Sequence, residues 1–280
     1  MPSSKKNSIY KISKVMCATN MSFIKKAGDN YDPNKLDRLI ISSRPGVGKT
    51  SALLNLPNSI FFDLEESSGY FKGDATTDVV DIQERMRVEG VGMLTAITRT
   101  IDEIKQSGKV YDFAIIDTLT KIDELAEIVA TAKYKASQQG KDFKGPSVLD
   151  LAYGAGYSLH RAEFQDIIDM FDSVAKRKIY SCHIKDSSIP KDGDQIAITD
   201  IKLTGSLKEI FSAKQDAACA LEIDPKNNNQ RLLNFKKTES SNFIKCRAQH
   251  LKNQIISISE ITDKNEFITY WDKIFLDLKK

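Results

Sequence analysis

Residues 43–50 form a short segment that combines one proline and two glycines with a lysine and a threonine, and read Ser-Arg-Pro-Gly-Val-Gly-Lys-Thr. The apolar run Leu39-Ile40-Ile41 precedes this segment, and residues 51–56 have the composition of a helix. A glycine-rich turn between a buried strand and a helix directs several backbone N–H groups toward one point, and the helix N-terminus adds a favourable dipole. The segment is therefore predicted to be a phosphate-binding loop.

The last two residues of the loop are the ones expected to bind phosphate and metal through their side chains. Lys49 is expected to reach the β- and γ-phosphates of ATP, and the Thr50 hydroxyl to bind Mg²⁺. A small residue, Ser43, stands where the motif G-x-x-x-x-G-K-[ST] has its first glycine, and smallness is what this position needs. The alternative is a chance Gly-x-Gly-Lys-Thr turn. The other expected nucleotide contacts are Ser43, Arg44, Pro45, Gly46, Val47, Gly48 and Ser51.

A second strand supplies an acid for the metal. Residues 113–116 are apolar and Asp117 follows them, at the carboxyl end of a predicted strand, where ligands bind in open α/β sheets. Asp117 is accordingly expected to hold Mg²⁺ together with Thr50. An ordinary helix cap before Thr118 is the competing interpretation.

Hydrolysis also requires a group that positions water. The strand after the phosphate-loop helix ends in Asp63-Leu64-Glu65-Glu66, so its carboxylates emerge at the same edge. We predict Glu65 as this group, because a carboxylate near the γ-phosphate can orient the attacking water. The residues alone leave Asp63 and Glu66 open, and also a purely solvated turn.

Alternating strands and helices through residue 183 predict an α/β fold with a mostly parallel sheet flanked by helices, extended by antiparallel edge strands. Three parts are expected: a basic N-terminal arm over 1–35, a nucleotide-binding domain over 36–262, and a C-terminal helix over 263–280. Capping-box spacing at Asp263 and Glu266 predicts that helix, and its apolar stripe is expected to cover the core.

Composition limits the class of protein but does not identify its partner. Lysine plus arginine number 41 against 38 acids, a net charge of +3, which is compatible with nucleic acid but is not evidence for it. The arm carries seven lysines against two aspartates. Four widely spaced cysteines argue against a zinc site and suit a reduced compartment. With neither a signal peptide nor an apolar stretch of membrane-spanning length, we expect a cytoplasmic protein that does not engage membranes.

These motifs resemble the RecA-like core of recombinases and hexameric helicases. The shared pattern is the phosphate loop, Asp-x-Glu over residues 63–65 and Ile-Ile-Asp-Thr-Leu-Thr over 115–120. The resemblance implies that Glu65 is the catalytic glutamate. It also implies that His183, at the end of a predicted strand over 178–182, senses the γ-phosphate and passes its state to DNA-binding loops. A hydrogen-bonded histidine at a strand end is the alternative.

Within this group the chain resembles in particular the short RecA-like ATPases of bacteriophages, which are associated with single-strand annealing and recombination. The shared elements are Tyr153-Gly154, the strand-end histidine and the late Lys245-Cys246-Arg247. The resemblance spans roughly residues 38–250, with specific motifs before residue 185 and loose ones after it. The filament linker Phe-x-x-Ala is absent, since Phe23 and Ala27 are one residue too far apart. This departure argues against filaments of that type.

Lys245 and Arg247 alternate on a predicted strand, so both side chains face the same way. RecA-like ATPases place the nucleotide between subunits, and the resemblance implies a homo-oligomer in which a neighbour donates a cation to the γ-phosphate. Such a residue stabilises the charge that develops on the transferred phosphoryl group. A solvated pair on an edge strand is the alternative.

Single-stranded DNA is the partner that the resemblance implies, contacted by the loop after His183 and by the insertion before it. Lysines beside long loops are usually only solvated, so the DNA assignment depends on the resemblance. An ATP-dependent switch without DNA activity and a helicase-type motor are the other hypotheses. The candidate DNA contacts are Lys133, Lys135, Lys141, Lys144, Lys185 and Lys191 for phosphates, with Tyr134 or Phe143 for base stacking.

Overall fold

The computed structural model describes residues 26, 28–29, 31–191, 194–238, 240–241, 243–262 and 266–278. The chain divides into a unit over Met1–Asp32 and a compact unit over Pro33–Lys280. Most of the expected arm lies outside the described residues. Pro33 belongs to the compact unit, where its carbonyl accepts a hydrogen bond from the Gln249 amide at 2.8 Å. No helix in the described part of the chain is long and apolar enough to cross a membrane.

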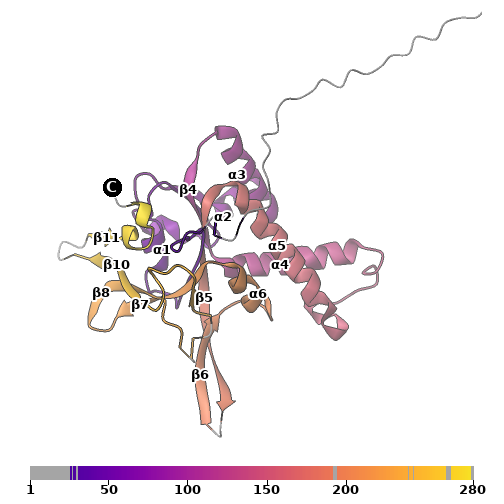
Figure 1. The fold of residues 1–280 in the computed structure, drawn as a ribbon. Helices are drawn as coiled ribbons and strands as arrows, with labels where there is room; N and C mark the ends of the chain where they lie inside the picture. Colours follow the sequence, from indigo (N-terminus) through magenta and orange to yellow (C-terminus); the bar gives the residue numbers. More distant parts are fainter. Residues whose placement is uncertain are drawn as a thin grey trace, which may run out of the picture. The chain divides into compact units, whose positions relative to one another are not determined.

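A mostly parallel sheet forms the centre of the compact unit (Figure 1). Neighbouring strands in its parallel part run in one direction, as the alternation of strands and helices predicts. From one edge inward, these strands are β3 (Asp78–Asp81), β2 (Ser59–Asp63), β4 (Tyr111–Asp117), β5 (Ala175–Lys191), β1 (Arg38–Ser43) and β7 (Ala217–Asp224).

Antiparallel strands extend the sheet beyond β7. They follow in the order β8 (Asn227–Asn234), β10 (Ile255–Ile261) and β11 (Phe267–Thr269), and the short β9 (Lys245–Cys246) pairs with the start of β7. The predicted α/β class with antiparallel edge strands is therefore confirmed.

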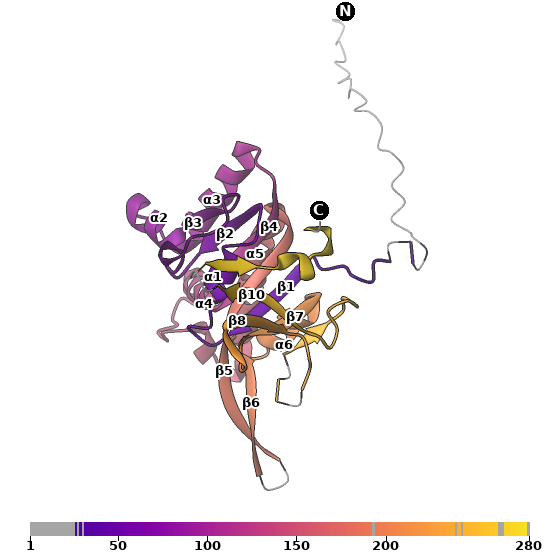
Figure 2. The same ribbon diagram turned by 90° about the vertical axis from the view of Figure 1, so that its left-hand side faces the viewer.

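Helices cover one face of this sheet, and α1 together with the C-terminal segment covers the other (Figures 1 and 2). Alternate strand residues divide between the two sides, as the pleat requires: Ile40 faces the first core, while Leu39 and Ile41 face the second. The first core packs against α2 (Ile82–Glu89), α3 (Met93–Ser107), α4 (Leu119–Ala136), α5 (Ala155–Met170) and α6 (Leu207–Lys214), and the second against α1 (Lys49–Leu53).

Local signals explain where these helices begin and end. The Asp81 carboxylate accepts a hydrogen bond from the Glu84 amide at 2.8 Å and caps α2, which ends at Gly90 with φ 64°. Short 3₁₀ helices complete the connections: Ser68–Tyr70, Val148–Asp150, Ala152–Gly154, Phe171–Ser173, Trp271–Lys273 and Leu276–Leu278.

Strand β5 continues beyond the apolar run that predicts it. Its first part lies in the sheet, while the part from Ile184 to Lys191 pairs with β6 (Asp194–Ile201). The result is a hairpin that projects from the sheet (Figures 1 and 2). A polar segment forms strands here because cross-strand backbone pairing, rather than burial, stabilises it.

The predicted C-terminal helix is wrong. Residues 267–269 form β11, and two 3₁₀ turns follow in place of an α-helix, while residues 263–265 and 279–280 lie outside the described part. The edge of β10 explains the difference, because pairing with β11 satisfies backbone groups that a helix would have left exposed there. Trp271 and Ile274 are buried in the second core, as a core-covering stripe requires.

Candidate functional site

The phosphate loop lies between the end of β1 and the start of α1. Gly46 and Gly48 have φ values of 79° and 98°, which only glycine adopts without strain. Gly48 is also the residue that caps α1. A Cβ atom there would lie 3.2 Å from the Arg231 Nε, a tight contact that the Arg231 side chain would have to relieve by shifting.

Lys49 and Thr50 of the loop lie beside Asp117, the acid at the end of β4. The Thr50 hydroxyl donates a hydrogen bond of 2.9 Å to Asp117 Oδ2, and Lys49 Nζ lies 3.9 Å from Asp117 Oδ1. Ser181, from β5, also donates to this carboxylate. The structure thus brings together the two residues predicted to hold the metal.

Asp117 fits a magnesium site by its chemistry. Its side chain is 1% exposed, and burial raises its pKa, against the lowering effect of the Lys49 charge and of the Ser181 and Thr50 hydrogen bonds. A buried carboxylate with a raised pKa is a position where a divalent cation would be favourable. Its oxygen, with the Thr50 hydroxyl, gives the hard donor set that Mg²⁺ prefers, and water and phosphate would complete the coordination.

The acids that follow β2 have different surroundings. Asp63 is fully buried, and its carboxylate accepts hydrogen bonds from the backbone amides of Glu65 and Ser68 at 3.0 and 2.7 Å, so it shapes the turn. Glu66 has φ 57° and forms an ion pair with Arg87. Among these acids, Glu65 is the one that lines the pocket beside the phosphate loop.

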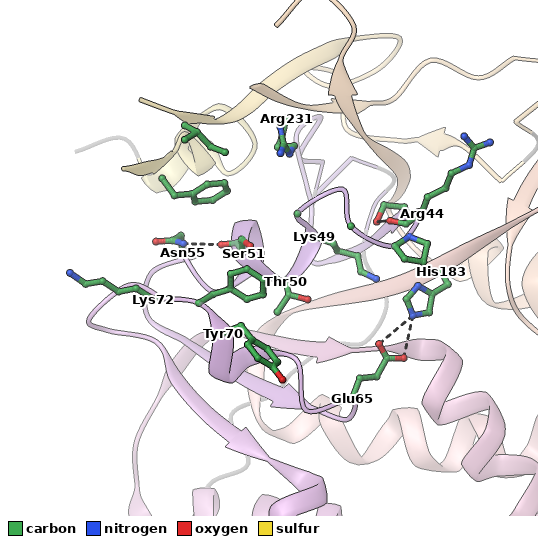
Figure 3. Close-up of a pocket in the computed structure, with 18 of the residues that line it drawn as sticks. Arg44, Lys49, Thr50, Ser51, Asn55, Glu65, Tyr70, Lys72, His183 and Arg231 are labelled. Carbon is green, nitrogen blue, oxygen red and sulfur yellow. Dashed lines mark hydrogen bonds and ion pairs between the residues drawn. The ribbon is translucent and has the colours of Figure 1, made fainter. Parts of the chain in front are cut away.

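Glu65 contacts the strand end that carries His183. His183 Nε2 lies 3.2 Å from both Glu65 carboxylate oxygens, and the Thr118 hydroxyl donates to Oε1 at 3.0 Å (Figure 3). Burial by itself would raise the pKa of Glu65. The hydrogen bonds and charge of His183, with Thr118 and Lys49, outweigh burial and lower this pKa. Glu65 is therefore ionised at neutral pH, as a water-positioning group must be.

A pocket of about 1040 Å³ joins these groups and extends past α1. In Figure 3, Glu65 and His183 lie at one end, Asn55 and Lys72 at the other, and Lys49 between them. The pocket is also lined by the apolar side chains of Phe71, Ile261 and Phe267. A pocket with both cationic and apolar lining suits a ligand with a polyphosphate and a flat ring.

Two arginines at this site have roles that sequence reasoning missed. Arg44 was predicted only as part of the loop, and its guanidinium lies 2.8 Å from Asp186 in the β5–β6 hairpin. Arg231, on β8, donates to the Val47 carbonyl at 2.6 Å. Arg231 lies 181 residues after Thr50, and only the pairing of β8 with β7 brings it here, so no local signal could have revealed it.

Lys245 and Arg247 lie away from this pocket within the same chain. Both donate to the Ala213 carbonyl, at 2.9 and 2.8 Å, which agrees with the predicted common direction. Because β9 pairs with the start of β7, they lie at the opposite end of the strands from the phosphate loop. They can act on a nucleotide only in another subunit.

Some of the candidate DNA contacts interact with other side chains of the protein. The Tyr134 and Phe143 rings pack edge to face with centroids 5.4 Å apart, and Lys133 forms an ion pair with Glu163 at 2.7 Å. Lys185 is exposed on the hairpin. Lys135 lies over the Phe143 ring, Lys141 and Lys144 are exposed, and the side chain of Lys191 lies outside the described part.

The phosphate loop lies at the end of a parallel strand, with a buried acid and a second carboxylate at the same sheet edge. This arrangement defines a P-loop ATPase with a RecA-like fold. The chain belongs to the AAA domain family, whose model matches residues 36–247.

Comparisons with individual proteins are less informative. No curated protein matches the chain. A solved structure that it resembles is a KaiC-like protein from the hyperthermophilic archaeon Pyrococcus horikoshii, at 14% identity and a TM-score of 0.42, over 84% of this chain and 89% of that one. So distant a likeness carries no argument about activity.

Proposed function

We propose that this ATPase binds and hydrolyses ATP with Mg²⁺ and acts on single-stranded DNA, as RecA-like proteins of bacteriophage recombination and strand annealing do. The observation that carries the proposal is the contact between Glu65 and His183. It joins the carboxylate beside the phosphate loop to the strand from which the hairpin projects.

In this proposal, the groups around the phosphate loop have separate tasks. The loop amides and Lys49 bind the phosphates, while Thr50 and Asp117 hold the Mg²⁺. Magnesium, when bound, withdraws charge from the phosphate oxygens. Glu65 accepts a hydrogen bond from the attacking water and orients it toward the γ-phosphate, and its lowered pKa keeps it ionised for this role.

The apolar lining of the pocket supports a nucleoside triphosphate rather than a bare polyphosphate. Phe71 and Phe267 contribute to this lining, and the Asn55 side-chain amide donates to the Ser51 carbonyl at 2.8 Å. In that arrangement the Asn55 side-chain oxygen is left as an acceptor. An acceptor in this pocket suits a base with an exocyclic amino group, such as adenine.

The hairpin supports the DNA part of the proposal. His183 lies at its base, directly before Ile184, where pairing with β6 begins. If Glu65 shifts when the γ-phosphate is lost, the His183 side chain would therefore transmit this movement to the hairpin. Arg44 and Asp186 provide a second link between the loop and the hairpin. Lys185 is exposed two residues after His183 and is our first candidate for a DNA phosphate contact.

A homo-oligomer is part of the same proposal. Lys245 and Arg247 lie at the opposite strand end from the phosphate loop, so they would complete the site of a neighbouring subunit. A neighbour's cation would stabilise the charge of the transferred phosphoryl group.

An ATP-dependent switch that contacts a protein is the second candidate, and the hairpin's charge favours it. Within its described side chains, Lys185 is the one cation, and the acids Asp186 and Asp200 pair with Arg44 and Lys208. A surface that offers a single cation attracts DNA phosphates weakly. A helicase-type motor has no comparable observation in its favour.

The decisive experiment is the ATPase rate of the purified protein with and without single-stranded oligonucleotides, at two salt concentrations. We expect stimulation that weakens as salt rises. Lys49→Ala should abolish nucleotide binding, and Lys185→Ala should reduce stimulation without changing the basal rate. If the ATPase rate does not change with oligonucleotides and the protein does not bind them, the switch hypothesis would be favoured.

A further inference from the structure

Arg231 reaches the phosphate loop from the antiparallel part of the sheet. It lies on β8, and its Nε donates to the Val47 carbonyl at 2.6 Å while its chain passes over Gly48. Figure 3 shows it on the side of the loop opposite Glu65. Arg231 lines the same pocket as Lys49 and Thr50.

The strands around Arg231 are irregular at this residue. The β7–β8 ladder shifts its register between Ile223 and Asp224, and the β8–β10 ladder shifts between Ser257 and Ser259. Arg231 pairs with Ile223 in one ladder and with Ser259 in the other, so it lies at both shifts. Bulges of this kind change the direction of a side chain, and they are common beside functional sites.

The charge of Arg231 has no acidic partner among the described residues. Its hydrogen-bond acceptors are the backbone carbonyls of Val47, Asn228 and Gln230. Partial burial lowers its pKa, and no acid opposes that effect. Other arginines differ, since Arg38 and Arg177 of the sheet and Arg44 of the phosphate loop each contact an aspartate. A partly buried, unpaired cation is costly unless an anion joins it.

We propose that Arg231 binds the polyphosphate of the nucleotide held by its own subunit. This rests on the proposed function, in which the pocket takes a nucleoside triphosphate. Nε and Nη1 are engaged by backbone carbonyls, and Nη2 has no hydrogen-bond partner among the described residues. The guanidinium is thus held through Nε and Nη1, and it offers the N–H groups of Nη2 to a phosphate oxygen. Arg231 differs in this from Lys245 and Arg247, which need a second subunit.

The test compares Arg231→Gln and Arg231→Lys with the unaltered protein, using the Kd for ATP and ADP, KM, kcat and the Tm without nucleotide. We expect Arg231→Gln to raise both Kd values about tenfold or more. Arg231→Lys should recover part of the affinity, because it keeps the charge but loses the planar fork. The Tm without nucleotide should not fall, since an unpaired cation has been removed.

Arg161→Gln is the matched control, because it removes one arginine from α5, where Arg161 contacts Ser206 at 3.4 Å outside the pocket. It should leave every constant unchanged. Unaltered Kd values in Arg231→Gln would overturn the proposal. So would a lower Tm and kcat at unchanged Kd, which would indicate that Arg231 only supports the loop. If the unaltered protein binds nucleotide no better than Lys49→Ala, the proposed function itself fails.

Discussion

His183 Nε2 lies 3.2 Å from both carboxylate oxygens of Glu65, although the two residues are 118 positions apart in the chain. One residue ends the in-sheet part of β5, and the other follows β2. Strand β4 lies between β5 and β2, so the contact crosses the sheet edge above it. It is a direct contact between the candidate hydrolytic group and the strand from which the hairpin projects.

Glu65→Gln should lower the ATP hydrolysis rate by about 100-fold or more, because the amide cannot act as a base toward water. Nucleotide affinity should stay within about threefold, since the phosphate loop is unchanged. Single-turnover hydrolysis and equilibrium binding measure the two effects. Glu66→Gln is the control, because Glu66 faces Arg87. A Glu65→Gln rate equal to that of the unaltered protein would remove Glu65 from its proposed role.

His183→Ala should move the acid limb of the pH–rate profile to higher pH. His183 helps to lower the pKa of Glu65, so its loss raises that pKa, and Glu65 becomes protonated at a higher pH. In the unaltered protein, the lowered pKa contributes stability above the ordinary value of 4.5, and this is lost as the pH falls through the folded-state pKa. His183→Gln, which can still donate a hydrogen bond, should shift the limb less. An unmoved limb in both variants would contradict the coupling.

Asp117→Asn should weaken the binding of Mg²⁺ in the presence of ATP by about tenfold or more. Because burial raises the pKa of Asp117, protons compete with the metal, and Mg²⁺ affinity in the unaltered protein should fall as the pH is lowered. Magnesium titrations at two pH values, followed by thermal shift, measure both effects. Asp112→Asn, at the exposed start of the same strand, should behave like the unaltered protein. Equal Mg²⁺ affinity in Asp117→Asn would exclude the predicted site.

Trp271→Ala should lower the free energy of unfolding by about 3–5 kcal/mol. Its ring is 3% exposed, and its Nε1 donates to the Ala52 carbonyl in α1 at 3.1 Å. The change therefore removes both core packing and the anchor of the C-terminal segment on the phosphate-loop helix. Urea denaturation measures the loss. Val110→Ala, at a side chain 81% exposed, should change stability by less than about 0.5 kcal/mol.

Local sequence signals were sufficient where a motif carries its own structural context. The loop over 43–50 requires a strand before it and a helix after it, and both are present as β1 and α1. The apolar run before Asp117 likewise predicts a buried strand with an acid at its carboxyl end, and β4 has this form. Parallel strands place their carboxyl ends at one edge, so the meeting of Thr50 with Asp117 follows from the pattern.

Local signals failed where the neighbouring strand decides the conformation. The C-terminal apolar stripe has helical spacing, yet Phe267 pairs with Ile261 of β10 and forms a strand. The residues without the family resemblance also left Asp63 and Glu66 open beside Glu65, because the choice depends on which carboxylate the turn amides bind.

Consecutive residues were enough to predict the phosphate loop, the acid of β4 and the alternating α/β order, since each depends on local chemistry. The folded chain was needed to show that Glu65 contacts His183, that Arg231 reaches Val47, and that Arg247 lies away from its own pocket. Those relationships depend on strand order and register, which arise from packing between segments far apart in the chain.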